Sequence, residues 1–257
     1  MPQVPFTNPL GNPFIELLSV DSTNNYALTQ IYAGLAQHGT AFFSHEQLAG
    51  KGQRGKTWTT GRDEGIILSV IIGPDTLSIN QQFELSACVA VSVRDFFAKY
   101  AGDETTIKWP NDLYWQDRKA GGILIENTMH GSLWKWSIAG MGININQAKF
   151  PDQLKNPVSL RQITGQIFDP ARLANELCHI LEKNYQSLTH NGFDDILKRY
   201  NQHLYKRNFS ARLKKENRTF DALIKGVNKS GELLTFHSIE ESFRFGEIEW
   251  VIPENNF

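Results

Sequence analysis

Residues 108–126 of the chain read Lys-Trp-Pro-Asn-Asp-Leu-Tyr-Trp-Gln-Asp-Arg-Lys-Ala-Gly-Gly-Ile-Leu-Ile-Glu. Apolar, β-rich segments predict three short strands here, over residues 105–109, 113–115 and 123–125, with a turn over residues 110–112 and a polar turn over residues 116–119. The turns then carry Lys108, the Asn111-Asp112 pair, Lys119 and Gly121-Gly122. Two cations and two glycines beside apolar strands indicate a buried anion site whose ligand approaches the backbone closely.

The composition limits the class of protein. With 257 residues and 40% hydrophobic content the chain can bury a large core, and a net charge of -1 argues against a general nucleic-acid or membrane-surface binder. Cys88 and Cys178 each lie in an apolar helical pattern, so neither a disulfide framework nor a thiolate metal cluster is expected. The sequence lacks a secretory leader and a run of about 18 apolar residues, which predicts a cytoplasmic protein.

The order of apolar patterns predicts two domains. Residues 1–206 alternate predicted strands with helices, over residues 82–100, 170–188 and 193–204, which indicates an α+β domain with a mixed β-sheet and flanking helices. From residue 207 the pattern changes to short alternating strands with charged turns. This pattern is typical of a small β-barrel, so we expect a C-terminal SH3-like β-barrel over residues 207–257.

The segment from Gly50 to Thr57 matches both G-x-G-x-x-G and the P-loop pattern G-x-x-x-x-G-K-T. Both motifs need a helix to begin at the last glycine, because the helix N-terminus holds the phosphates. Residues 57–65 are β-branched, aromatic and broken by glycine, so no helix is expected there. The segment is therefore predicted to be a flexible basic loop that closes over a phosphorylated ligand, with a plain solvated loop as the alternative.

Two further segments allow a binding or a structural interpretation. Ser22, Thr23 and Asn24 follow a predicted strand at a helix start, where they either cap the helix or also contact a polar ligand. Residues 140–146 follow the strand predicted over residues 133–139, and Asn144 is their candidate ligand contact. A plain turn is the alternative for that segment.

Taken together, these motifs resemble the biotin protein ligase family. The matching segments are Asp-Ser-Thr-Asn at 21–24, Gln47 with the glycine loop at 50–55, Lys-Trp-Pro-Asn-Asp at 108–112, residues 118–126, and the Gly-x-Gly-Ile-Asn run at 140–144. Gln53 departs from the family, which commonly has arginine at this place, and the place is associated with retaining the adenylated intermediate. A predicted strand already begins at Phe14, so we expect a monofunctional ligase without the DNA-binding domain of the regulatory members.

The resemblance implies a fold like the class II aminoacyl-tRNA synthetases and a specific reaction. Biotin and ATP, with Mg²⁺, would give biotinyl-5′-AMP, and the biotinyl group would pass to a lysine of a biotin carboxyl carrier domain of a biotin-dependent carboxylase. Neither DNA nor a membrane is an expected partner, and a homodimer is left open. The rivals are a lipoate ligase, a P-loop nucleotidase and a biotin-sensing or DNA-binding regulator.

The resemblance also implies roles for individual residues. Lys119 and Lys108 would be catalytic, and Asp112 would hold Mg²⁺. The biotin-binding set would be Ser22, Thr23, Asn24, Gln47, Lys51, Gly52, Gln53, Lys119, Gly121 and Gly122. The ATP- and adenylate-binding set would be Lys51, Arg54, Trp58, Lys108, Asn111, Asp112 and Asn144.

Overall fold

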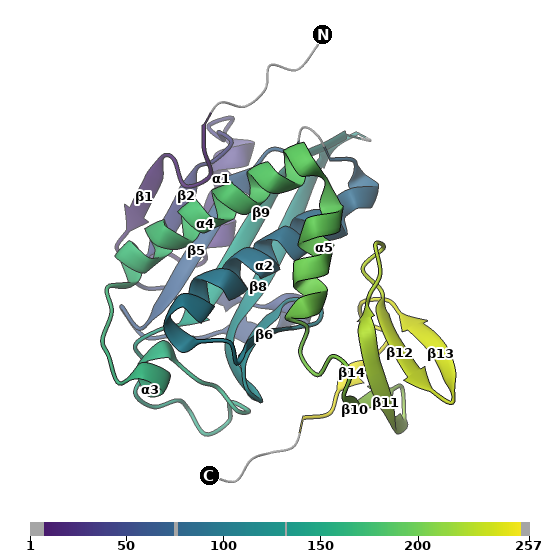
Figure 1. Cartoon of the computed structure of the whole chain (residues 1–257). Coiled ribbons are helices and arrows are strands. Elements are labelled where there is room, and N and C mark those ends of the chain that lie inside the picture. Colours follow the sequence, from purple (N-terminus) through teal and green to yellow (C-terminus); the bar gives the residue numbers. More distant parts are fainter. Residues whose placement is uncertain (1–7, 75–76, 132, 253–257) are drawn as a thin grey trace.

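A mixed seven-stranded sheet forms the centre of the larger part of the molecule (Figure 1). The computed structural model describes residues 8–74, 77–131 and 133–252. Across the sheet the strands are β1 (Phe14–Leu17), β2 (Ala41–Ser44), β5 (Gly65–Ile72), β9 (Leu133–Asn144), β8 (Arg118–His130), β7 (Asp112–Trp115) and β6 (Thr105–Lys108). Only β1 and β2 run parallel, and every other neighbouring pair is antiparallel.

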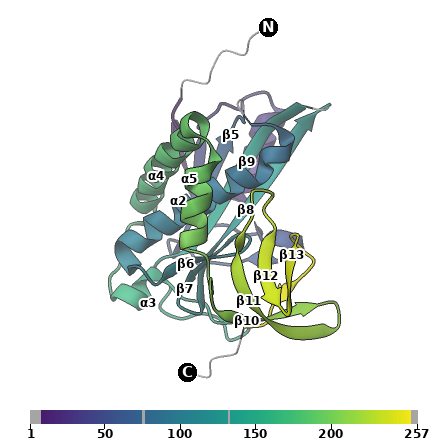
Figure 2. The same ribbon diagram turned by 45° about the vertical axis from the view of Figure 1, so that its right-hand side comes forward.

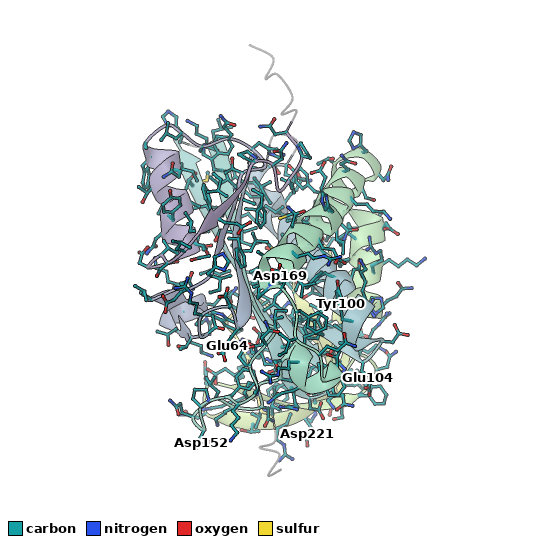
Figure 3. The ribbon with its side chains drawn as sticks, turned by 90° about the vertical axis from the view of Figure 1, so that its left-hand side faces the viewer. Glu64, Tyr100, Glu104, Asp152, Asp169 and Asp221 are labelled. Atoms are coloured by element: carbon teal, nitrogen blue, oxygen red, sulfur yellow. The ribbon has the colours of Figure 1, made fainter. Side chains whose placement is uncertain are left out.

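Helices cover both faces of this sheet. One face carries the long helices α2 (Gln82–Ala101), α4 (Pro170–Asn191) and α5 (Phe193–Gln202), together with the short α3 (Leu160–Thr164). The helix α1 (Thr23–Tyr32) lies on the other face. Figure 3 shows the sheet nearly edge-on, with Tyr100 and Asp169 on the side of the long helices. Asp169 caps α4 by accepting hydrogen bonds from two backbone amides, and Tyr100 donates to Glu176 at 2.6 Å.

Alternation along β5 explains how one strand serves both faces. Ile66, Leu68, Val70 and Ile72 pack into the main core beneath the long helices. Ile71 belongs to a small separate core with Ala27 of α1, on the opposite face. Because successive strand residues point to opposite faces, Ile67 and Ser69 also face the side of α1.

The C-terminal part is a five-stranded antiparallel sheet. Its strands lie in the order β13 (Ile239–Phe243), β12 (Leu233–His237), β11 (Arg218–Val227), β10 (Ser210–Lys215) and β14 (Glu249–Trp250). Figure 2 shows it beside the end of the main sheet that carries β6 and β7. The indole N–H of Trp109 donates to the Gly231 carbonyl at 2.9 Å, and that of Trp250 donates to the Trp109 carbonyl at 3.1 Å. The predicted fold class is confirmed, whereas the domain boundary at residue 206 stays a prediction.

Two local predictions were wrong. Residues 140–144 are the last part of β9 and not a turn at a strand end. The polar turn expected over residues 116–119 is also shorter, because β8 begins at Arg118. Backbone pairing explains the second difference, since Arg118 and Lys119 already pair with Trp115 and Tyr114 of β7.

Cys88 and Cys178 are free thiols buried in α2 and α4, as the sequence predicts. Among the described residues, no helix combines the length and the apolar character that crossing a bilayer requires.

Candidate functional site

A cleft of about 410 Å³ lies on the α1 side of the sheet and extends to the C-terminal part. Its volume is in the range of small-molecule sites in proteins. Of the sixteen site residues predicted from the sequence, fourteen line this one cleft: Ser22, Thr23, Asn24, Gln47, Lys51, Gly52, Gln53, Arg54, Trp58, Lys108, Asn111, Asp112, Lys119 and Gly122. Residues that are far apart in sequence therefore meet in a single site.

One end of the cleft is polar and uncharged. Ser22 caps α1, and its hydroxyl oxygen accepts from the Asn25 amide at 3.5 Å. The Thr23 amide donates to Gln47 Oε1 at 2.9 Å, so the helix start and the residues after β2 are fixed to one another. The sequence left capping and ligand contact as alternatives, and the structure supports capping while also placing these side chains in the cleft.

The other end of the cleft holds two lysines around one carboxylate. Lys119 Nζ lies 2.6 Å from Asp112 Oδ1, and Lys108 Nζ lies 3.6 Å from Asp112 Oδ2. Lys108 also lies over the rings of Tyr114 and Trp250, 5.1 and 5.7 Å from their centroids. Burial lowers the pKa of Lys108, although Asp112 opposes that effect. This end therefore presents fixed positive charge in a partly desolvated place, which suits an anionic ligand.

The glycine loop is a hairpin and not a P-loop. It consists of β3 (Gly50–Lys51), a single 3₁₀ turn (Gln53–Gly55) and β4 (Thr57–Trp58), so no helix begins at Lys56. Arg54 has a left-handed backbone with φ 55°, and its guanidinium lies 4.8 Å from the centre of the Phe245 ring. The loop therefore contacts the C-terminal part at the mouth of the cleft.

Two glycines of β9 let other groups approach the sheet. A Cβ at Gly140 would lie 2.3 Å from Asn24 Oδ1, and one at Gly142 would lie 2.6 Å from the indole of Trp58. Both distances are far inside van der Waals contact, so these positions need glycine. The glycines that looked like a turn are therefore the places where α1 and the glycine loop rest on the sheet.

Sequence reasoning missed the contribution of the C-terminal part. Phe245, Gly246, Ile248, Glu249 and Trp250 all line the cleft. A Cβ at Gly246 would lie 1.7 Å from Arg54 Nη2, so this glycine makes room for the arginine. A Phe-Gly pair in a charged turn was the available signal, but it does not indicate which distant segment the turn contacts.

Two predicted site residues lie outside the cleft lining. Asn144 is buried, and its amide donates to the backbone carbonyls of Val158 at 3.1 Å and Lys119 at 3.4 Å. Gly121 faces β9, where a Cβ would lie 2.8 Å from the Gly142 carbonyl oxygen. In this structure Asn144 therefore supports the backbone of Lys119, and its assigned role as an adenylate contact stays a prediction.

Comparison with known proteins identifies the class to which this fold and site belong. The biotin/lipoate A/B protein ligase family model matches residues 17–144. A biotin protein ligase from Aquifex aeolicus, solved in complex with biotin and ATP, has the same fold, with a TM-score of 0.79 over 96% of this chain and all of that one, at 22% identity.

Sequence relatives narrow the class. A biotin–[acetyl-CoA-carboxylase] ligase from Paracoccus denitrificans is 30% identical over 191 residues, which are 70% of this chain and 76% of that protein. The bifunctional ligase/repressor BirA of Bacillus spizizenii is 32% identical over 202 residues, 77% of this chain. The match spans 62% of the length of that Bacillus relative. The chain belongs to the biotin protein ligase family.

Proposed function

We propose that this protein is an ATP-dependent biotin protein ligase. It forms biotinyl-5′-AMP and then transfers the biotinyl group to a lysine of a biotin carboxyl carrier domain. The observation that carries the proposal is a single cleft with an uncharged polar end, at Ser22, Thr23 and Gln47, and a cationic end, at Lys108 and Lys119. A ligand with a neutral polar ring and a carboxylate tail fits that order of chemistry.

The first half-reaction brings two anions together. A biotin carboxylate oxygen attacks the α-phosphorus of ATP, the bond to the bridging oxygen breaks, and pyrophosphate leaves. Lys119 is the residue best placed to act, because its ammonium lies in the cleft and can turn from Asp112 to the reacting oxygens. A fixed donor that meets charge as it develops stabilises the transition state more than the separate reactants.

Asp112 and Lys108 would serve the phosphates. Mg²⁺ in nucleotide sites is commonly held by one or two carboxylates together with the phosphates. Asp112 fits that requirement, because its carboxylate lies in the cleft between Lys108 and Lys119. The two lysines would also attract the phosphate oxygens, so carboxylate and phosphates would lie close together. A bound Mg²⁺ would neutralise part of the phosphate charge, while Lys108 is held in place by the rings of Tyr114 and Trp250.

The second half-reaction requires the mixed anhydride to survive until the acceptor arrives. The ε-amine of the acceptor lysine attacks the acyl carbon, AMP leaves, and the amine proton passes to solvent. Lys51, Arg54 and Lys56 of the glycine loop lie over the cleft and would cover the adenylate, which reduces hydrolysis by water. We place the reaction in the cytoplasm, since two free buried thiols are common in a reducing compartment.

Pyrophosphate exchange into ATP tests the first step, with biotin and lipoate compared as the activating acid. We expect exchange with biotin and little or none with lipoate. Incubation with an isolated carrier domain should then raise the mass of the acceptor by one biotinyl group, at one lysine. Exchange with lipoate and not with biotin would contradict the proposal, and so would an acceptor of unchanged mass.

A further inference from the structure

Ser69 is the polar residue of β5, whose other members are glycine and aliphatic residues. It is 0% exposed and does not line the cleft. Its hydroxyl oxygen lies 2.7 Å from Thr23 Oγ1 and 2.6 Å from Asn24 Oδ1, two residues that do line the cleft. A buried hydroxyl with two short contacts allows its hydrogen bonds to be assigned one by one.

The amide of Asn24 decides the direction of these bonds. Its Nδ2 donates to the Glu126 carboxylate at 2.7 Å and to the Leu124 carbonyl at 3.3 Å, so Oδ1 is the atom that faces Ser69. An amide oxygen can only accept, and a serine hydroxyl has one hydrogen. Ser69 must therefore donate to Asn24, because two oxygens 2.6 Å apart without a hydrogen would repel. The hydrogen between Ser69 and Thr23 then comes from Thr23.

This assignment fixes what the cleft offers to a ligand. The Thr23 hydrogen points away from the cleft to Ser69, and Thr23 Oγ1 keeps a lone pair as an acceptor. Gln47 Oε1 lies at a longer 3.4 Å from Thr23 Oγ1 and already accepts the Thr23 amide at 2.9 Å. The bond from the Thr23 amide orients the Gln47 side chain and leaves its Nε2 as a donor. This Nε2 lies over Gly50, where an added Cβ would be 2.4 Å from it.

We infer that Ser69 is a positioning residue that makes Thr23 a hydrogen-bond acceptor and so sets the specificity of the polar end of the cleft. The inference rests on the proposed function and adds the reason for its ring specificity. A matching ligand must present an N–H to Thr23 beside a carbonyl that accepts from Gln47 Nε2. A cyclic urea has that pair of groups on adjacent atoms, whereas a dithiolane ring has neither.

The test compares biotin with two cyclic carbamate analogues, in each of which a ring oxygen replaces one of the two urea N–H groups. In the wild-type protein, one of the two carbamates should show a KM in pyrophosphate exchange about tenfold above that of biotin, for the loss of one hydrogen bond. In Ser69→Ala the Thr23 hydroxyl is free to turn and donate to the ring oxygen. The ratio should then fall below about threefold, with the KM for ATP unchanged.

Ser137→Ala is the matched control. Ser137 is also a 0% exposed serine, lies on the neighbouring strand β9, and donates to an asparagine oxygen, Asn127 Oδ1, at 2.8 Å. Neither of these two residues lines the cleft. Ser137→Ala should keep the wild-type ratio between the KM for the carbamate and the KM for biotin. If Ser69→Ala only disturbed the structure, the KM values for biotin and for both carbamates would rise together.

A second variant keeps the inference testable if Ser69→Ala does not fold. Thr23→Val removes the acceptor with little change of shape, and it should also abolish the discrimination against the carbamate. An unchanged ratio in Ser69→Ala or in Thr23→Val would overturn the inference while leaving the ligase proposal intact. A wild-type protein that shows no exchange with biotin would contradict the proposed function, and the inference would fall with it.

Discussion

Replacing Lys119 by alanine should abolish the activation of biotin and leave the fold intact. The Lys119 side chain is 35% exposed, and its ion pair with Asp112 contributes no more than about 1 kcal/mol to stability at that exposure. Asp112 keeps Lys108 as a partner at 3.6 Å, so the substitution does not strand a carboxylate. The loss of a preorganised donor at the reacting charges costs about 2.7–4 kcal/mol, which corresponds to a roughly hundred- to thousandfold slower exchange.

The assay is biotin-dependent exchange of pyrophosphate into ATP, measured together with the thermal unfolding midpoint. Lys206→Ala is the control, because Lys206 is 37% exposed and pairs with Asp117 at 2.8 Å but does not line the cleft. We expect both variants to unfold near the wild-type temperature and only Lys119→Ala to lose exchange. Near-normal exchange in Lys119→Ala would refute the assigned role, and so would an equal loss in Lys206→Ala.

Three further results are expected. Residues 50–56 should gain protection from proteolysis when biotin and ATP are both present, and unchanged cleavage would count against a closing loop. Gln53→Gly should speed the release of the adenylate only modestly, so a large leak, measured by filter retention, would mean that Gln53 replaces the family arginine effectively. Because burial lowers the pKa of Lys108, exchange should fall as the pH rises through that lowered pKa, where the charge is lost. Lys108→Arg should move the fall to higher pH, and coincident pH profiles would show that another group titrates.

The cationic end of the cleft could be predicted from the sequence because its chemistry is local. Lys108, Asp112 and Lys119 lie on the consecutive antiparallel strands β6, β7 and β8, so two short turns were enough to bring them together. The polar end required the family resemblance, since Thr23 and Gln47 meet because the segment before α1 pairs with the segment after β2, at the bridge between Val20 and Gln47.

The rest of the site depends on contacts that no local pattern specifies. A glycine pair favours a turn and a close approach equally, and only the pairing of Gly142 with β5 and β8 places it inside a strand, where Trp58 lies against it. The wall formed by Phe245 depends on how the two sheets meet. Ser69 did leave a signal, because a lone hydroxyl within an aliphatic strand needs a partner.

The two indoles at the junction have a consequence for protein engineering. Trp250 donates to the backbone of Trp109, and its ring also faces the ammonium of Lys108, while Trp109 in turn holds the Gly231 carbonyl. A chimaera that carries the C-terminal sheet of a relative would exchange part of the cationic end of the cleft as well. Grafts of this kind should succeed only when Trp109 and Trp250 are transferred together with the residues that they contact.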